Sequence, residues 1–190
     1  MTASLLKTAE LLGSRRRILV TGGAGFIGGA VVRRLLRESD AVVFNLDKMG
    51  YASDLSSIEA VLADLGSDHS ERHQLLKVDL ADAEAVRVAV QTADPDLVMH
   101  LAAESHVDRS IAGPGVFIES NVTGTYNLLQ AVREHHEQLN DERQEQFRLH
   151  HISTDEVFGS LGREGRFCET TPYDPRSPYS SSKAASDHLV

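Results

Sequence analysis

With 190 residues, of which 41% are apolar and 25% charged, the chain has the size and composition of one ordinary soluble domain, or of one domain and a fragment of another. The 28 acidic residues outnumber the 19 basic ones, and the net charge of −9 excludes a protein built to neutralise nucleic-acid phosphates. A single cysteine and apolar runs far shorter than the roughly 20 residues of a membrane span leave an acidic, cytoplasmic protein without an internal disulfide.

Residues 1–16 differ from the rest of the chain, and we interpret them as an N-terminal extension. Apolar residues at helical spacing end at Gly13-Ser14, while Lys7 and Glu10 interrupt the apolar core that a secretory signal requires. We therefore expect an appended helix or a loose arm. The apolar positions are Leu5, Leu6, Ala9 and Leu12.

From residue 17 onward, strand-like and helix-like segments alternate. The expected strands are 17–20, 41–46, 74–78, 97–101 and 148–153, and the expected helices between and after them are 26–37, 55–65, 81–92, 116–136 and 178–190. Residues 138–146 are expected to be the solvated end of the long helix plus a loop, and Ser177 is expected to cap the last helix. This alternation predicts an α/β fold, a doubly wound parallel sheet of Rossmann type, over 17–190.

The strongest local signal is the glycine-rich turn at 21–28, between the first strand and the first helix. Gly22, Gly25 and Gly28 allow a tight turn, a close approach of the backbone to a pyrophosphate, and close packing of helix on strand. Free N–H groups at the start of the helix then face the phosphates. The spacing is GxxGxxG rather than the commoner GxGxxG, and the turn still predicts a dinucleotide site.

Acidic residues follow at the ends of the next two strands. Asp47 is placed to accept hydrogen bonds from ribose hydroxyls and to repel a 2′-phosphate, although the neighbouring Lys48 blurs this preference for NAD over NADP. Asp79 and Leu80 are expected to bracket an adenine. The alternative is a glycine-rich turn with aspartates that only cap helices.

Tyr179 and Lys183 are four residues apart on the last helix, so both face one side. A phenol is a poor base at neutral pH, but a nearby ammonium and a cationic nicotinamide ring favour its phenolate. Such a pair is common by chance on exposed helices. After a nucleotide-binding turn, it is the expected pair for removing a hydroxyl proton during hydride transfer.

Polar residues also close the last two expected strands. Thr154, Asp155 and Glu156 follow the fifth strand, where ligands bind in open α/β sheets. Two carboxyl groups in unlike surroundings can serve as acid and base for the removal of water, but the triplet equally suits a simple turn cap. The small residues that close the fourth strand are expected to let a ribose and nicotinamide lie against the backbone. They are Leu101, Ala102 and Ala103, followed by Ser105 and His106.

The nine histidines do not predict a metal site. His69 and His73 are four apart, but the glutamate between them is misplaced for the metalloprotease helix motif, and the adjacent histidine pairs do not share a helix face. We therefore expect no metal. Cys168, in a glycine-rich loop, is expected to be a bystander.

Four segments resemble the dTDP-glucose 4,6-dehydratase family of extended short-chain dehydrogenase/reductases. They are 21–28, 100–111 (HLAAESHVDRSI), 153–159 (STDEVFG) and 173–190 (YDPRSPYSSSKAASDHLV). The glycine turn and Tyr-x-x-x-Lys are shared across that superfamily, whereas the Thr-Asp-Glu triplet and LAAESHVDRSI are more specific to nucleotide-sugar 4,6-dehydratases. The resemblance implies a tightly bound NAD, a nucleotide-sugar substrate and a homodimer formed through the long helix and the Tyr/Lys helix.

The resemblance also implies roles for individual residues. Tyr179 takes the proton of the sugar 4-hydroxyl and Lys183 holds the ribose, while Thr154 hydrogen-bonds the 4-oxygen. Glu156 then takes the C5 proton, and Asp155 protonates the departing 6-hydroxyl. Ser105 matches a substrate contact. Positions that line the cofactor are matched by Phe26, Ile27, Asp47, Lys48, Asp79, Leu80, Ala102, Ala103 and Ser120.

Two alternatives remain open. A UDP-sugar 4-epimerase or decarboxylase shares the glycine turn and the Tyr/Lys pair but is expected to lack the adjacent Asp155-Glu156 pair. A non-catalytic NAD-binding fragment is the other, because the family's chains are longer and continue into a C-terminal substrate domain. We expect that domain to be absent here, and little or no turnover from this chain alone.

Overall fold

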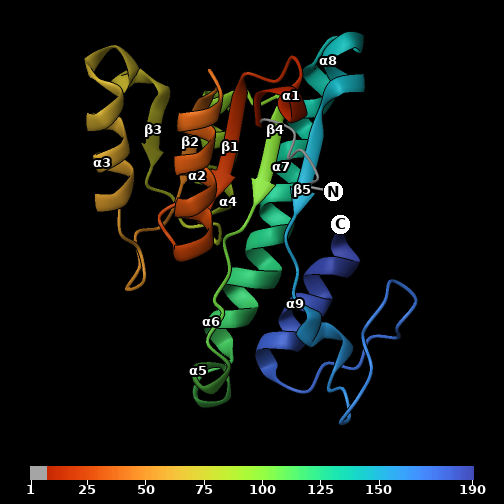
Figure 1. Cartoon of the computed structure of the whole chain (residues 1–190). Coiled ribbons are helices and arrows are strands. Elements are labelled where there is room, and N and C mark those ends of the chain that lie inside the picture. Colours follow the sequence, from red (N-terminus) through yellow and green to blue (C-terminus); the bar gives the residue numbers. More distant parts are fainter. Residues whose placement is uncertain (1–7) are drawn as a thin grey trace, which may run out of the picture.

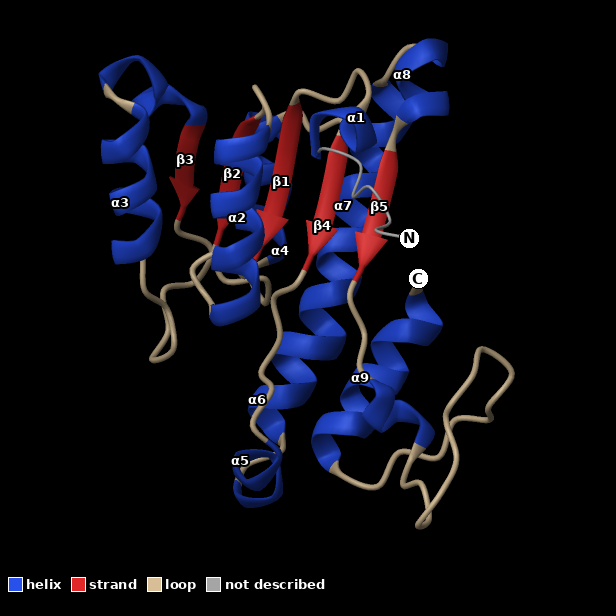
Figure 2. Cartoon of the chain, in the orientation of Figure 1, coloured by secondary structure: helices blue, strands red, loops and turns tan. Residues whose placement is uncertain are grey.

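The computed structural model describes residues 8–190, and a five-stranded parallel sheet of order β3–β2–β1–β4–β5 runs through it (Figures 1 and 2). The strands are β1 (Arg17–Thr21), β2 (Val42–Leu46), β3 (His73–Leu76), β4 (Leu97–His100) and β5 (Arg148–His151). Neighbouring strands pair in parallel, so Thr21 at the end of β1 lies between Leu46 of β2 and His100 of β4. All five strands therefore end at one edge of the sheet.

Helices cover both faces of this sheet (Figure 2). They are α2 (Phe26–Glu38) and α3 (Ser56–Leu65) on one face, and α4 (Ala83–Ala93) and α7 (Gly124–Gln138) on the other. Ile18 and Val43 are fully buried under α2 and α3, while their neighbours Leu19 and Phe44 are buried under α4 and α7. Successive strand residues point to opposite faces, so each strand contributes to both cores. The predicted doubly wound parallel sheet is confirmed.

The helix predicted at 116–136 is confirmed, and the backbone stays helical from Gly115 to Gln138. It is preceded by α5 and begins with α6 and a π-helical turn, η2, before α7; the bounds are α5 (Val107–Ala112), α6 (Gly115–Phe117) and η2 (Ile118–Thr123). The buried Asn121 side chain in this turn accepts a hydrogen bond from the Glu104 N–H at 2.8 Å and donates one to the Glu104 carbonyl at 2.9 Å. Apolar spacing carries no trace of such a polar contact, which is why the π turn was not predicted.

The expectation for 138–146 was also wrong. Residues Asp141–Gln146 form a separate helix, α8, and the Asn140 side chain caps it by accepting a hydrogen bond from the Arg143 N–H. Leu139, between α7 and α8, has extended backbone and ends the longer helix. Two short 3₁₀ turns were not predicted either. They are η1 (Ser67–Arg72) and η3 (Asp155–Phe158).

Both ends of the described chain pack against the domain. The short helix α1 (Thr8–Leu12) continues the predicted N-terminal pattern, and Leu12 is buried with the α2 core, whereas Leu5 and Leu6 lie outside the described residues. The last helix, α9 (Pro178–Leu189), begins at the expected cap, where Ser177 and Ser180 form a reciprocal capping box. No helix within 8–190 is long and apolar enough to cross a membrane.

Asp96 holds the start of β1 in place, at the end of the sheet opposite the predicted site. Its carboxylate accepts hydrogen bonds from the N–H groups of Arg16 and Arg17, both at 3.0 Å, and pairs with Arg143 at 2.9 Å. Burial alone would raise the pKa of Asp96, but the N–H donors and the guanidinium outweigh burial and hold the pKa below its ordinary value.

We expect Asp96→Asn to lower the free energy of unfolding at pH 7 by about 1–3 kcal/mol, because the N–H groups lose a charged acceptor. A carboxyl whose pKa is lowered by folding stabilises the protein above its unfolded pKa, and this contribution is lost as the pH falls through the folded pKa. Urea unfolding across the acid range checks this, with Glu142→Gln on exposed α8 as the control. A difference between wild type and Asp96→Asn that stays constant down to acid pH would contradict the assignment.

Candidate active site

The glycine turn between β1 and α2 is as tight as the sequence predicts. Gly22 has a φ of +69°, and a Cβ there would lie 2.7 Å from the Cα of Ala102. A Cβ on Gly28 would lie 2.1 Å from the Gly22 carbonyl oxygen, so the start of α2 packs directly on the turn. Gly25, the N-cap of α2, faces more open space. Gly23 has a close contact that the sequence did not reveal, because a Cβ there would meet the buried Asn45 side chain at 2.2 Å.

Asp47 lies at the carboxyl end of β2, as predicted, and is buried. One carboxylate oxygen accepts a hydrogen bond from the Ala24 N–H at 3.0 Å, and the other accepts from the Met49 N–H and the Ser53 hydroxyl, both at 2.8 Å. A carboxylate offers about four acceptor positions, so about one remains for a ligand. Asp47 therefore also holds the glycine turn against the loop after β2.

Two of the predicted cofactor residues contact each other. The Lys48 ammonium lies 2.9 Å from Glu104 Oε1 and 3.2 Å from the Ser120 hydroxyl. Lys48 follows β2, Glu104 follows β4 and Ser120 lies in η2, so this cluster joins three segments across the carboxyl edge of the sheet. The positive charge beside Asp47 is thereby paired with Glu104.

The other predicted ligand contacts fall into exposed and buried groups. Phe26 is 95% exposed and Ile27 62% exposed on the first turn of α2, an unusual degree of exposure for large apolar side chains. In contrast, the Leu80 side chain is buried in the core beneath α4 and α7, which leaves mainly its backbone for a ligand. Asp79, Ala103 and Ser105 are exposed, and Leu101 and Ala102 are half-buried.

The predicted Tyr/Lys pair lies on α9, against the chain that leaves β5. Tyr179 and Lys183 are both buried. The Lys183 ammonium donates a hydrogen bond to the Ile152 carbonyl at 2.8 Å. The Thr154 side chain is near enough to the Tyr179 hydroxyl to act on the pKa of that phenol. The edge of the Phe117 ring packs against the Tyr179 ring, with the ring centres 6.4 Å apart.

The acid pair lies directly beside this tyrosine. Thr154 begins the 3₁₀ turn η3, and its hydroxyl accepts a hydrogen bond from the Glu156 N–H at 3.3 Å. Asp155 and Glu156 are exposed on this turn, so burial does not distinguish the two carboxyl groups. Thr154 thus caps a turn, as the structural alternative proposed, and also contacts Tyr179. The structure brings together all five residues predicted to be catalytic.

The electrostatics of Tyr179 differ from the expectation. Burial raises the pKa of Tyr179 above its ordinary value and outweighs the opposing hydrogen bond with Thr154, while the charges of Glu156, Asp155 and Asp187 raise the pKa further. The Lys183 ammonium is directed to the Ile152 carbonyl, and the charges that act on the Tyr179 pKa are those of carboxylates. Burial also lowers the pKa of Lys183.

His100 is a buried residue that sequence reasoning missed. Its Nδ1 lies 2.7 Å from the Thr21 hydroxyl and its Nε2 lies 2.9 Å from the Thr125 hydroxyl. The Thr125 hydroxyl donates to the Asn121 carbonyl, so it accepts from Nε2, which must carry the hydrogen. Burial, aided by the charges of His151 and Lys183, lowers the pKa of His100 to about 3. A neutral His100 therefore ties the end of β1 to α7; a histidine at the end of a strand gives no sequence signal for this.

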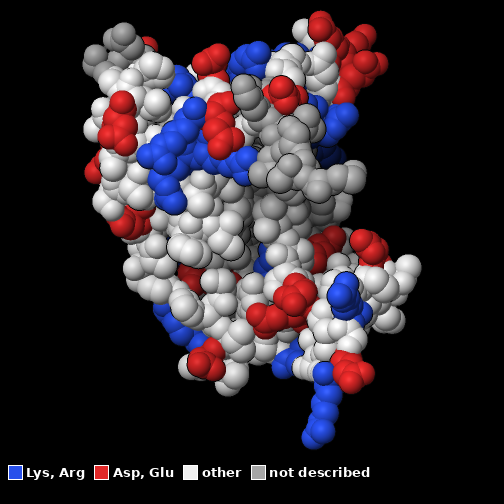
Figure 3. Space-filling view, in the orientation of Figure 1, with Lys and Arg blue, Asp and Glu red and all other residues white. Residues whose placement is uncertain are grey.

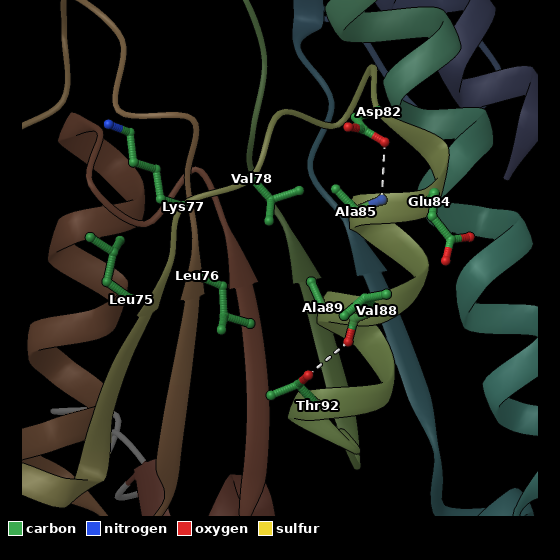
Figure 4. Close-up of a pocket in the computed structure, with 10 residues that line it drawn as sticks. All are labelled: Leu75, Leu76, Lys77, Val78, Asp82, Glu84, Ala85, Val88, Ala89 and Thr92. Carbon is green, nitrogen blue, oxygen red and sulfur yellow. Dashed lines mark hydrogen bonds between the residues drawn. The ribbon is translucent and has the colours of Figure 1, made fainter.

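A hollow of about 550 Å³ lies away from this cluster, between the edge strand β3 and α4 (Figure 4). Its walls are mostly apolar, and its acids serve structural roles: Asp82 caps α4 by accepting from the Ala85 N–H, and Glu84 pairs with Arg87. None of the predicted site residues lines it. The lining residues are Leu75, Leu76, Lys77, Val78, Asp82, Glu84, Ala85, Val88, Ala89 and Thr92.

The remaining charged and nucleophilic groups do not form a second centre. Basic side chains gather over α2 in Figure 3, but Arg34 pairs with Glu38 and Arg37 with Asp64. Within 8–190, no group of three or more His, Cys, Asp or Glu side chains is arranged to hold a metal ion. Cys168 is exposed, and hydrogen bonds from nearby threonine hydroxyls lower the pKa of its thiol to about 7.

Comparison with known proteins identifies the family of this chain. Residues 19–190 match the family model described as GDP-mannose 4,6 dehydratase. The dTDP-glucose 4,6-dehydratase of Neisseria meningitidis serogroup B is 55% identical over 177 residues, which are 92% of this chain and 48% of that protein. The chain spans about half the length of the curated relatives it matches.

Solved structures of two activities have the same fold. One is the dTDP-glucose 4,6-dehydratase of Streptomyces venezuelae, solved with NAD bound. The match includes 91% of this chain and 50% of that protein, with a TM-score of 0.74 and 41% identity. The other is the UDP-glucose 4-epimerase of Thermus thermophilus, in complex with NAD. The match includes 91% of this chain and 49% of that protein, with a TM-score of 0.73 and 32% identity.

We expect Gly28→Ala to destabilise the chain by about 1–3 kcal/mol, because the new methyl group overlaps the Gly22 carbonyl and forces α2 away from the turn. Gly162→Ala is the matched control, since a Cβ there meets open space. Chemical denaturation of both variants checks the prediction, and equal stability of the two would show that the turn can relax without cost.

Proposed function

The chain belongs to the GDP-mannose 4,6 dehydratase family, and we propose that it binds NAD and removes water from a nucleotide-activated glucose, with dTDP-glucose as the first candidate. The product is the 4-keto-6-deoxy sugar. The observation that carries the proposal is the contact between η3 and α9, where Thr154 joins the acid pair to Tyr179. A tyrosine base and two carboxyl groups at one point suit dehydration rather than oxidation alone.

The residues around the glycine turn fit NAD. No side chain caps the start of α2 at Gly25, so the first N–H groups of that helix are left for phosphates. Asp47 retains about one acceptor position for a ribose hydroxyl. Pairing of Lys48 with Glu104 weakens the attraction for a 2′-phosphate and favours NAD over NADP. When bound, NAD supplies an acceptor for the sugar's C4 hydride and later returns that hydride to C6.

The chain's own residues move the protons. Tyr179 takes the proton of the sugar 4-hydroxyl while Thr154 hydrogen-bonds the 4-oxygen, and Lys183 is placed to hold a ribose. A carbonyl at C4 makes the C5 proton acidic, and Glu156 removes it. Asp155 protonates the departing 6-hydroxyl, so that water leaves across C5–C6. Glu156 then gives its proton back to C5 when the hydride returns to C6. Ser105, exposed after β4, is the proposed additional contact to the substrate.

A UDP-sugar 4-epimerase is the competing activity, because a UDP-glucose 4-epimerase has the same fold over this chain. Epimerisation needs the tyrosine but no acid–base pair for C5 and the 6-hydroxyl. Asp155 and Glu156, adjacent on η3, favour the dehydratase. Product mass distinguishes the two activities, since dehydration loses one water and epimerisation loses nothing.

The first test is incubation of the purified 190-residue chain with NAD and dTDP-glucose, followed by mass spectrometry. Loss of one water that disappears in Glu156→Gln and persists in Glu164→Gln, an exposed loop control, would establish the activity in this chain. Bound NAD without loss of water would assign the chain the role of a cofactor-binding module. A chain that does not bind NAD would contradict the proposal.

We also propose that the protein acts in the cytoplasm as a homodimer, in which the surface of η2 and α7 packs against a second copy. Ile118 is 49% exposed and Tyr126 50% exposed on this surface, two large apolar side chains of the same long helix. Exposed apolar surface of this kind marks association sites. A cytoplasmic location is supported by the single free cysteine, Cys168.

We expect Tyr126→Glu to weaken self-association at least about tenfold, because a charge would be buried in an apolar contact. Val88→Glu is the control, since Val88 is an exposed apolar residue of comparable exposure, 48%, on α4. Sedimentation velocity over a range of concentrations measures both. A wild-type chain that stays monomeric at every concentration would refute the dimer.

A further inference from the structure

One side of α9 contacts the segment that links β5 to η3 at three successive helical turns. Tyr179, Lys183 and Asp187 are spaced four residues apart, so they form a row along the helix. The first contacts Thr154 and the second donates to the Ile152 carbonyl. The proposed mechanism uses these two residues and leaves Asp187 without a role.

Asp187 makes the most contacts of the three. One of its carboxylate oxygens accepts a hydrogen bond from His151 Nε2 at 2.9 Å. The other accepts from the Ser153 hydroxyl at 2.5 Å and the Tyr173 hydroxyl at 3.1 Å. The Asp187 side chain is only 9% exposed, and hydrogen bonds to a buried charge are strong. Three separate parts of the chain therefore meet at this carboxylate: the end of β5, the segment just before η3, and the loop before α9.

The spacing of helix and extended chain matches over the first two contacts, because Tyr179 and Lys183 are four residues apart and meet Thr154 and Ile152, which are two apart. Four residues of helix advance about 6 Å, and two residues of extended chain advance about 6.6 Å. The side chains of His151 and Ser153 point to the same side of the extended segment, which lets one carboxylate hold both. Lys183 holds the backbone between them at Ile152. Side chains of one helix, α9, thus bind both the side chains and the backbone of the segment that leads to Thr154.

We propose that Asp187 is a positioning residue that sets the place of Thr154, Asp155 and Glu156 relative to Tyr179. This rests on the proposed function, because it assigns the three residues a common reaction centre. Asp187 fixes Ser153, the residue directly before the triplet, to the helix that carries the tyrosine. Without this bond, the hydrogen bonds that α9 makes to the end of β5 reach only as far as His151 and Ile152, before the triplet begins.

The charge of Asp187 also reaches the proposed base. Asp187 acts with Asp155 and Glu156 to raise the pKa of Tyr179, and it counteracts the lowering of the Lys183 pKa by burial. The pKa of His151, which bonds to Asp187, is lowered by burial and by the charge of Lys183, so a neutral ring donates through Nε2. The His151 ring therefore does not neutralise the charge of Asp187.

The test uses Asp187→Asn, which keeps the shape of the side chain and removes its charge. Tyrosinate absorbance is followed against pH, and subtraction of the same variant with Tyr179→Phe isolates Tyr179 from the other three of the four tyrosines. We expect the Tyr179 midpoint to move to lower pH. Hydrogen exchange of amides 154–158 is expected to become about tenfold faster or more, as for the loss of a hydrogen bond to a charged group.

Two further variants keep the result interpretable. Tyr173→Phe removes one donor but leaves the carboxylate, so the Tyr179 midpoint should stay unchanged. Ser153→Ala removes the bond nearest to η3 and should speed exchange at 154–158 even if Asp187→Asn does not fold. Unchanged exchange at 154–158 in Ser153→Ala, or an unchanged Tyr179 midpoint in a folded Asp187→Asn, would overturn the proposal. Neither measurement depends on turnover, so failure of dehydration would leave both readouts intact.

Discussion

The candidate site depends on the parallel pairing of the strands. When every strand runs in the same direction, every connection after a strand begins at one edge, and the groups that follow the strands are brought together regardless of their distance in sequence. This places the glycine turn after β1 within contact of Ala102 after β4, and Asp47 after β2 within hydrogen-bonding distance of Ala24. The residues that come just before this edge have a different role: Leu46, directly before Asp47, is buried in the core beneath α4 and α7.

The second constraint is the attachment of α9 to the chain leaving β5. The sheet alone delivers Thr154 to the edge, but it does not orient the acid pair, because η3 begins after the last paired residue of β5. Hydrogen bonds from a single helix to side chains and backbone of residues 151–154 supply that orientation. The tyrosine and the carboxyl groups are therefore held by the same helix, and their relative placement does not depend on the rest of the sheet.

The sequence was sufficient for the features that rest on local pattern. Five strands, the turn at 21–28 and the cap at Ser177 follow from apolar alternation, glycine spacing and capping chemistry, and all were confirmed. The π turn at Asn121 and the pKa of Tyr179 were not predictable in this way, because they depend on partners far away in sequence. Asn121 bonds to Glu104, and the pKa of Tyr179 reflects burial that only the folded chain creates.

The two activities found on this fold differ in what surrounds the tyrosine and not in the scaffold that carries it. Dehydratases and epimerases share the sheet over the same part of the chain, so the fold alone does not choose between them. The choice lies in a few residues of one short turn. Asp155 and Glu156 are exposed on η3, close enough for their charges to act on Tyr179. Because a raised phenol pKa opposes proton removal, a site that needed only the tyrosine would gain from losing these carboxylates. The proposed dehydration gives these carboxylates a use beside the base, because in that reaction they transfer protons themselves.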